Sequence, residues 1–270
     1  MPELPEVEVT RLGLEPALVG ARVTAVASRT PRLRYPLPRQ LAQRLTGQRL
    51  AAIVRRGKYL LFDFGIGHLL LHLGMTGSLR LVSAATAPQA HDHFDLVFAS
   101  RIMRLRDPRR FGAVLWLTED PTLHPLIAVL GQEPLDDTFT PAWLYAQTRG
   151  RSASIKQTLM DSHLVVGIGN IYASESLFRA GIDPRRPATA ISLARYRRLV
   201  PAIRETLQAA ITAGGSSLRD FVHTDGSAGY FQQQYFVYGR AGEPCHRCGA
   251  KVLSLRQGGR ASFRCPRCQR

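Results

Sequence analysis

The sequence lacks the features that would direct it to a membrane or to an oxidising compartment. No stretch approaches the roughly 18 consecutive apolar residues of a membrane-spanning helix, and no cationic-then-apolar signal segment opens the chain. Cysteine is absent before Cys245, and all four cysteines lie between Cys245 and Cys268. This clustering argues against a disulfide framework. We therefore expect a soluble, cytoplasmic protein.

Acidic residues are scarce. The 270 residues include 36 Lys+Arg against 20 Asp+Glu, which gives a formal net charge of +16. Such an excess favours a polyanionic partner, and nucleic acid is the first candidate. An anionic membrane surface is the alternative. However, the basic residues are spread along the chain rather than gathered on one amphipathic helix, so we predict no membrane association.

The spacing of apolar residues predicts an α+β fold in three parts. Residues 1–132 are expected to form an N-terminal helix and an antiparallel β-sandwich, because one helical segment is followed by short strands separated by turns. Residues 133–234 form a helical domain, and residues 235–270 a zinc ribbon. The expected strands are 22–27, 50–54, 59–64, 68–73, 94–99, 102–106 and 113–117, and the expected helices are 5–19, 141–148, 153–160, 171–180 and 192–213.

The four cysteines are spaced as two close pairs. Cys245 and Cys248 are separated by two residues, as are Cys265 and Cys268, with sixteen residues between the pairs. Each pair can direct two thiolates at one ion, and two such turns complete a tetrahedral shell. The spacing therefore predicts one Zn²⁺ bound by four cysteines. A closed shell has no open position, so this metal is structural.

The first six residues read Met1-Pro2-Glu3-Leu4-Pro5-Glu6. Removal of Met1 would expose Pro2 as a secondary amine, which can attack an aldehyde-like carbon and form an iminium. Glu3, one peptide bond away, could then act as acid or base. The alternative interpretation is a helix start, because Pro5 suits a first helical position and acidic residues suit the positive end of the helix dipole.

Two turns could contact an anion or DNA. Residues 165–170 place Gly167 and Gly169 before a helix, so that backbone N–H groups and Asn170 could face an anion; a plain turn between helices is the alternative. The segment 107–112 presents two arginines and Phe111, which could enter a base stack; the alternative there is a surface turn.

Two further features are ambiguous. Lys58 is either a hairpin-tip charge or a cation directed at a reaction centre. His91, Asp92 and His93 could suggest metal ligands, but adjacent residues of a strand point to opposite faces. A polar pair near DNA is the preferred interpretation.

Taken together, these motifs resemble the formamidopyrimidine-DNA glycosylase family, the bacterial repair enzymes for oxidised purines. The likeness runs from Pro2 to Cys268. It rests on the segments 2–8, 57–61, 72–75, 91–93, 107–112, 167–176 and 237–240 and on the two cysteine pairs. The resemblance implies an N-terminal helix on a β-sandwich, a helix–two-turn–helix domain and a zinc ribbon. The implied partner is duplex DNA containing oxidised purines or abasic sites, bound by a monomer in the bacterial cytoplasm at the nucleoid.

The resemblance also implies residue roles. Pro2 would attack C1′ of the damaged nucleotide and form a Schiff base, Glu3 would protonate the opening sugar, and Lys58 would aid elimination and hold phosphate. The space left by the flipped nucleotide would be filled by Met75, Arg109 and Phe111. The DNA backbone would be held by His91, Arg151, Lys156 and Asn170. Arg260 would contact phosphates around the lesion and is associated with the second elimination, and residues 216–230 would cover the lesion base.

Two other functions remain open from the sequence. The endonuclease VIII branch of the same superfamily prefers oxidised pyrimidines, although Leu4 and the set Met75, Arg109 and Phe111 favour purines. A non-catalytic zinc-ribbon DNA-binding protein would share the charge and the cysteines but has no use for an N-terminal Pro-Glu. Arg151 departs from the family pattern, where Lys is common, which keeps the charge but changes the donor geometry.

Overall fold

The computed structural model describes residues 1–215 and 235–270, and these residues form two compact units. Unit 1 consists of residues 1–128 and 213–215, and unit 2 of residues 129–212 and 235–270. The segment 216–230, which we expect to cover a lesion base, lies outside the described residues. Among the described helices, none has both the length and the apolar character needed to cross a membrane.

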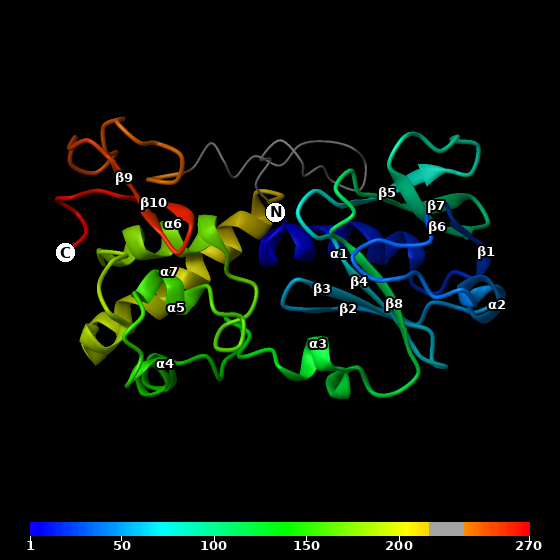
Figure 1. Ribbon diagram of the computed structural model, residues 1–270, viewed down its shortest axis with the longest axis horizontal. Helices are drawn as coiled ribbons and strands as arrows, with labels where there is room; N and C mark the ends of the chain where they lie inside the picture. The colour runs from blue at the N-terminus through cyan, green and yellow to red at the C-terminus, as the bar shows by residue number, and fades with distance from the viewer. Residues whose placement is uncertain (216–234) are drawn as a thin grey trace. The chain divides into compact units, whose positions relative to one another are not determined.

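Unit 1 contains two four-stranded antiparallel sheets, with strand orders β1-β6-β7-β5 and β2-β3-β4-β8. Figure 1 shows α1 lying alongside the strands. The elements are α1 (Leu4–Leu18), β1 (Val23–Ser28), α2 (Leu41–Leu45), β2 (Ala52–Arg56), β3 (Tyr59–Asp63), β4 (His68–His72), β5 (Ser78–Ser83), β6 (Asp92–Phe98), β7 (Arg101–Arg106), β8 (Ala113–Leu117), η1 (Pro121–Leu123) and α3 (Pro125–Ala128). The predicted helix and β-sandwich are confirmed.

One hydrophobic core joins both sheets and α1. Phe62 and Leu71 from one sheet, Phe94 and Leu105 from the other, and Leu14 of α1 belong to a single cluster of buried side chains. Each sheet therefore contributes apolar side chains to the core. This core fixes the strand ends, and the turns at those ends carry the residues discussed below.

Strand β5 is not among the strands expected from the sequence. Its sequence Ser-Leu-Arg-Leu-Val-Ser mixes polar and apolar side chains, and it is an edge strand that pairs only with β7. An edge strand with one solvated face has a weak apolar pattern. Its strand conformation is determined by pairing with a strand that is distant in the sequence.

The described residues of unit 2 form helices and a β-hairpin. They are α4 (Pro141–Thr148), α5 (Ile155–Leu159), α6 (Asn170–Ala180), η2 (Ala188–Ala190), α7 (Leu193–Thr212), β9 (Leu253–Gln257) and β10 (Arg260–Arg264). As predicted, Ser192 begins α7: its Oγ accepts a hydrogen bond from the Arg195 N–H at 3.4 Å. The helix α7 packs against α4 and α6.

The β9–β10 hairpin and the cysteine turns form the ribbon, which packs on α6. Phe178 of α6 is buried in a cluster with Val237, Val252 and the buried cysteines Cys245 and Cys265. The Gln269 side chain donates to the Ile182 carbonyl oxygen at 2.9 Å and accepts from the Cys265 N–H at 2.8 Å. These contacts join the ribbon to the helices within unit 2.

Candidate functional site

The N-terminal turn is buried and capped. Pro2 and Glu3 are both buried, and the Glu3 N–H donates to Glu6 Oε2 at 2.8 Å. The carbonyl oxygen of Glu3 accepts from the Val7 N–H at 3.1 Å, so α1 begins immediately after it. The cap gives Pro2 and Glu3 a fixed direction at the start of α1. The helix-start interpretation and the catalytic interpretation are therefore compatible.

Ion pairs tie α1 to the turn that carries Lys58. Glu8 of α1 accepts from Arg55 Nε at 2.8 Å and from Arg11 Nη2 at 2.8 Å. Arg55 also donates to the Gly57 carbonyl oxygen at 3.2 Å. Burial raises the pKa of Glu8, but the hydrogen bonds from Arg11 and Arg55 outweigh it and hold the pKa below its ordinary value. Glu8 thus stays ionised and links the helix to the Gly57-Lys58 turn.

His72 lies beside the Lys58 turn. It pairs with Tyr59 across β3 and β4, with the two rings 4.8 Å apart. Burial, together with the positive charges of Lys58 and Arg34, lowers the pKa of His72 to about 4. Its Nδ1 accepts the Gly74 N–H at 3.0 Å. His72 is therefore a neutral ring at pH 7 that fixes the start of the Met75 loop.

Asp107 fastens the two loops that carry the predicted DNA-inserting side chains. It is fully buried, and its two carboxylate oxygens accept from Thr76 Oγ1 at 3.0 Å and from the Gly112 N–H at 2.7 Å. One bond reaches the Met75 loop, and the other closes the 107–112 turn. Asp107 has no role of its own among the expectations from the sequence. An Asp directly before Pro108, at the start of a turn, was the available signal.

The two loops also touch through backbone. Gly74 has a φ of +65°, and a Cβ there would lie 2.4 Å from the Phe111 carbonyl carbon and 2.5 Å from the Gly112 nitrogen. Only glycine fits this approach. This close approach brings the loop of Met75 next to the 107–112 turn. The side chains of Met75 and Phe111 are 38% and 46% exposed. The Arg109 guanidinium lies 4.7 Å from the centre of the Phe111 ring.

The His91–His93 segment borders the same turn. The His91 carbonyl oxygen accepts from the Asp107 N–H at 3.0 Å, while the His91 side chain is exposed at a φ of 72°. His93 is buried, with Nε2 3.1 Å from the Asp107 carbonyl oxygen. Within the described residues, the one group able to hold a metal is the four-cysteine cluster, so these histidines form no metal site there.

In unit 2, Lys156 and Asn170 meet at the ribbon hairpin. Lys156 Nζ donates to the Ala261 carbonyl oxygen at 3.0 Å and to Ser262 Oγ at 2.6 Å, and Asn170 Nδ2 donates to the same Ala261 oxygen at 3.0 Å. The Lys156 side chain is almost fully buried, whereas Arg260, next to Ala261, is exposed. The structure thus joins residues about a hundred positions apart and leaves Arg260 at the surface.

Arg151 is half-buried and paired with Asp161, their Nη1 and Oδ2 atoms 2.8 Å apart. Burial raises the pKa of Asp161, but the Arg151 hydrogen bond outweighs it and keeps the pKa low. The ion pair with Asp161 therefore holds the Arg151 side chain in place.

The four cysteines form one cluster. Their Sγ atoms lie within 4.8 Å of one another, and Gly249, at a φ of 72°, closes the first turn. Burial, together with the neighbouring cysteines, raises the pKa of Cys268 to about 12. Four thiolates this close would repel one another. A divalent cation would remove that repulsion, so the residues fit one structural Zn²⁺. The predicted ligand set is confirmed.

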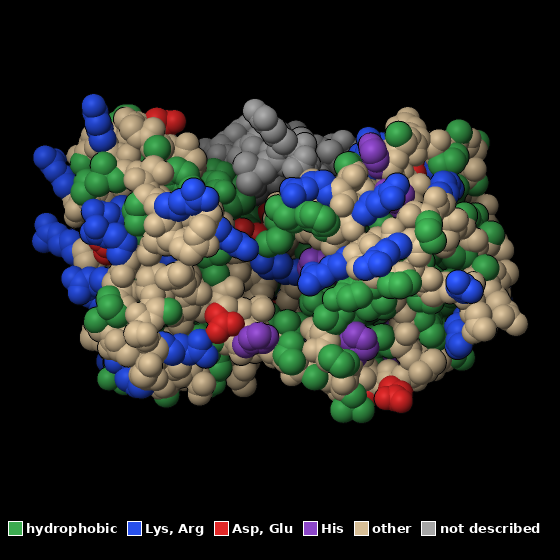
Figure 2. Space-filling view, in the orientation of Figure 1, with side chains coloured by type: hydrophobic (Ala, Val, Ile, Leu, Met, Phe, Trp, Pro, Cys, Tyr) green, Lys and Arg blue, Asp and Glu red, His purple; other side chains and the backbone are tan. Residues whose placement is uncertain are grey.

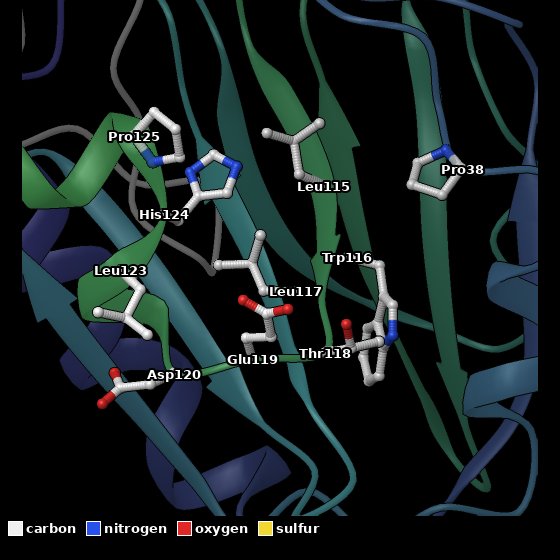
Figure 3. A pocket seen from close by; sticks show the side chains of 10 residues that line it. All are labelled: Pro38, Leu115, Trp116, Leu117, Thr118, Glu119, Asp120, Leu123, His124 and Pro125. Atoms are coloured by element: carbon white, nitrogen blue, oxygen red, sulfur yellow. The ribbon is translucent and has the colours of Figure 1, made fainter.

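Unit 1 also contains a pocket of about 320 Å³ beside β8. The side chains of Leu115, Leu117 and His124 surround its centre, with Trp116 and Glu119 nearby (Figure 3). None of the predicted site residues lines it. Its mixed apolar and acidic lining differs from the cationic surroundings of Lys58, and we assign it no part in the site.

Comparison with known proteins covers nearly the whole chain. The model of the formamidopyrimidine-DNA glycosylase N-terminal domain matches residues 1–114, and that of the H2TH domain of the same enzymes matches residues 130–222. A zinc finger found in FPG and IleRS matches residues 242–270.

Individual relatives match over their full length. A formamidopyrimidine-DNA glycosylase of Aromatoleum aromaticum is 61% identical over 270 residues, covering 100% of both chains. A solved Lactococcus lactis FPG mutant in complex with a Fapy-dG containing DNA has a TM-score of 0.92 at 35% identity, covering 100% of both chains. A structure of MutM in complex with carbocyclic 8-oxo-G containing DNA has a TM-score of 0.91 at 36% identity, again covering 100% of both chains.

Proposed function

Because this chain belongs to the formamidopyrimidine-DNA glycosylase family, we propose that it removes oxidised purines from duplex DNA and then cleaves the strand at the resulting abasic site. Similar solved structures are complexes with Fapy-dG containing DNA and carbocyclic 8-oxo-G containing DNA, which supports purine lesions here. The excess of positive charge supports a DNA partner.

The reaction begins with extrusion of the damaged nucleotide, which costs a few kcal/mol and less for a damaged base. The Pro2 nitrogen, freed by removal of Met1, attacks C1′ and forms a C–N bond while the glycosidic bond breaks. Glu3 protonates the opening sugar, and the nitrogen becomes an iminium. The iminium acidifies the C2′ proton, whose loss expels the 3′ phosphate; a second elimination expels the 5′ phosphate. Water then hydrolyses the iminium, which frees Pro2 and releases the sugar as an unsaturated aldehyde. A one-nucleotide gap with phosphate at both ends remains.

The loops of unit 1 would fill the space left by the extruded nucleotide. Met75 and Phe111 are large, apolar and exposed, as an intercalating wedge requires, and Arg109 can face the orphaned base. His91, exposed just before β6 and bonded through its carbonyl oxygen to the Asp107 N–H, would hold a phosphate. Asp107 keeps these residues in place before DNA arrives, so less binding energy is spent on ordering them.

In unit 2, Arg260 is the residue best placed to touch phosphate, because its side chain is exposed at the hairpin tip. Lys156 and Asn170 would act largely through the Ala261 carbonyl oxygen, by fixing the position of the hairpin. Arg151, ion-paired with Asp161, would contribute a directed guanidinium to the backbone. The Zn²⁺ bound by the four cysteines stabilises the ribbon and takes no part in bond breaking.

One observation carries the proposal above the others. The buried Pro2-Glu3 turn is the capped start of a helix that Glu8 and Arg55 tie to the Lys58 turn. An N-terminal amine, an adjacent carboxylate and a cation on one rigid frame are the groups needed for iminium catalysis. A DNA-binding protein without catalytic activity has no need for this arrangement.

Glu3→Gln tests the role of the carboxylate. We expect excision of 8-oxoguanine to fall by about 10²- to 10⁴-fold, the usual contribution of a general acid, while binding of lesion DNA persists. Glu15→Gln is the matched control, because Glu15 lies on the same helix but is 43% exposed and pairs with Arg11. Unchanged excision in Glu3→Gln would remove Glu3 from the mechanism.

Borohydride reduction tests the covalent step. We expect it to join the protein to lesion DNA, with the sugar mapped by mass spectrometry to the peptide that begins at Pro2. A cross-link mapped to Lys58 would contradict the proposed nucleophile, and the absence of any cross-link would favour a non-catalytic binder. Faster cleavage of thymine glycol than of 8-oxoguanine duplexes would favour the endonuclease VIII alternative.

A further inference from the structure

Unit 2 has a basic pocket formed by segments that the proposed mechanism does not use. The pocket has a volume of about 540 Å³ and lies between the loop after α6 and the end of the ribbon. It is lined by Asp183, Arg185, Arg186, Arg264, Pro266, Gln269 and Arg270. In Figure 2, lysine and arginine side chains gather on the side of unit 2 where Figure 1 marks the C-terminus.

The lining carries far more positive than negative charge. Its one carboxylate side chain, Asp183, binds Arg185 with Oδ2 and Nη2 2.7 Å apart, and Arg264 Nη1 lies 3.3 Å from the same oxygen. Asp183 is thus shared by two guanidinium groups. The Arg186 side chain makes no hydrogen bond or ion pair with any described residue.

Further arginines of α7 adjoin the pocket. Arg195 Nη1 donates to the Arg270 backbone oxygen at 2.6 Å, which brings the first turn of α7 to the pocket rim. Burial and the nearby charges of Arg186 and Arg198 lower the pKa of Arg195, so these three cations stand close enough to repel one another. Arg198 is exposed and has no partner among the described residues. Protein folding alone gains nothing from this crowding, whereas a bound anion would relieve it.

The pocket adjoins the surface that we assign to DNA. The Arg186 carbonyl oxygen accepts from the Ile155 N–H at 2.7 Å, one residue before Lys156. The Pro184 carbonyl oxygen accepts from Gln257 Nε2 at 3.3 Å, on the strand that leads to the Arg260 hairpin. The loop that carries Arg185 and Arg186 is therefore bonded both to the helix of Lys156 and to the ribbon hairpin.

We propose that this pocket, with Arg195 and Arg198 at its rim, binds backbone phosphates of duplex DNA that flanks the segment holding the lesion. The inference rests on the proposed binding of duplex DNA. Guanidinium forks match phosphate oxygens in pairs, and phosphate contacts give affinity without sequence preference. The pocket would lengthen the electrostatic contact and hold the protein on undamaged DNA beside a lesion.

The test compares the salt dependence of binding to two duplexes with a central lesion, of about 12 and about 40 base pairs. Arg186→Ala/Arg198→Ala removes one partly exposed and one exposed cation. Each phosphate contact adds about 0.9 to the slope of log affinity against log salt. We expect the slope on the long duplex to fall by about 1.8, so that the affinity ratio between 50 and 200 mM salt shrinks about 10-fold. On the short duplex the slope stays unchanged.

Two controls keep the result specific. Arg186→Lys/Arg198→Lys keeps both charges and should retain most of the slope. Arg101→Ala removes one exposed cation in unit 1, where Arg101 begins β7 at the end opposite the Asp107 turn; it should leave both slopes unchanged.

Three outcomes would overturn the inference. An unaltered slope on the long duplex would show that the pocket touches no phosphate. An equal loss on both duplexes would place these arginines at the lesion segment instead. If the wild-type protein failed to bind the short lesion duplex, the proposed function would fall together with the inference, whereas the first two outcomes leave that function intact.

Discussion

The two units hold their candidate site residues by different means. In unit 1 a buried carboxylate, Asp107, fastens the Met75 loop and the 107–112 turn with hydrogen bonds from Thr76 and Gly112. In unit 2 the hairpin that carries Arg260 belongs to a ribbon whose four cysteine sulfurs lie within 4.8 Å of one another and would repel as thiolates unless a cation joined them. The chain therefore supplies all the groups that order the first site, whereas the second requires a metal.

Removal of zinc should produce the largest difference between the two units, because it should unfold only the ribbon of unit 2. Cys265→Ala, or chelation of the wild-type metal, should unfold the ribbon, because zinc binding supplies most of the folding energy of such small domains. We expect affinity for lesion DNA to fall by at least about 100-fold, since Arg260 loses its position. Metal analysis, DNA binding and thermal unfolding of unit 1 are the measurements.

The matched control for the metal is His246→Ala. His246 lies between the first two ligands in the sequence but is exposed and outside the four-cysteine cluster. Its metal content and affinity should match the wild type. Full DNA affinity after verified loss of zinc would show that the ribbon does not depend on its metal.

Asp107→Ala should affect unit 1 alone. The substitution leaves the Gly112 N–H and the Thr76 hydroxyl without their acceptor, and hydrogen bonds to a charged group contribute about 1.5 to 3 kcal/mol each. We expect unit 1 to lose about 3 to 4 kcal/mol of stability and excision to decline, with zinc content unchanged. Denaturant unfolding and metal analysis check both halves of this prediction.

Asp63→Ala is the control for that variant, because Asp63 also accepts a backbone N–H, from Gly65, but is partly exposed. Its cost should stay near 1 kcal/mol, about that of an ordinary hydrogen bond. Equal losses for the two variants would mean that Asp107 has no special part in joining the loops.

The stability of unit 1 should also depend on pH, with a smaller effect than that of Asp107→Ala. The folded pKa of His72, about 4, lies below its ordinary value of 6.5, so protons bind the unfolded chain more readily. The contribution to stability is complete above pH 6.5, declines as the pH falls and levels off near 4. We expect a loss of about 3 kcal/mol across this window, measured by denaturant unfolding against His72→Gln.

The difference in stability between the wild type and His72→Gln reports on His72 alone. The pKa of His93 is also lowered, mainly by burial, but His93 is present in both proteins and cancels. Parallel stability curves for the wild type and His72→Gln between pH 4 and 6.5 would show that His72 is not held neutral by its surroundings.

Much of the fold could be predicted because it is encoded locally. The predicted helix start at Pro5 differs from the observed α1 start by one residue, because proline and acidic residues mark the first turn. The strands β2, β3, β4 and β8 could be predicted from their apolar runs. The edge strand β5 could not, because its register depends on β7, which follows it by 18 residues.

Contacts between site residues that are far apart in the sequence could not be predicted from sequence patterns. The sequence suggested that Lys156 holds the DNA backbone, and the observed side chain is buried against Ala261 and Ser262. No local spacing relates positions 156 and 262. The same holds for the close approach of Gly74 to Phe111, which follows from the pairing of β4 with β8 in one sheet.

The sequence by itself determined the metal ligands, the N-terminal Pro-Glu and the excess of positive charge. These are properties of residue type and of short spacing, and they exist before the chain folds. The tertiary structure alone decided that Asp107 joins two loops, that Lys156 faces the ribbon, and that arginines from separate segments crowd around Asp183. Such arrangements arise only when packing of the core brings distant segments together, because side chains far apart in sequence have no fixed relation in the unfolded chain.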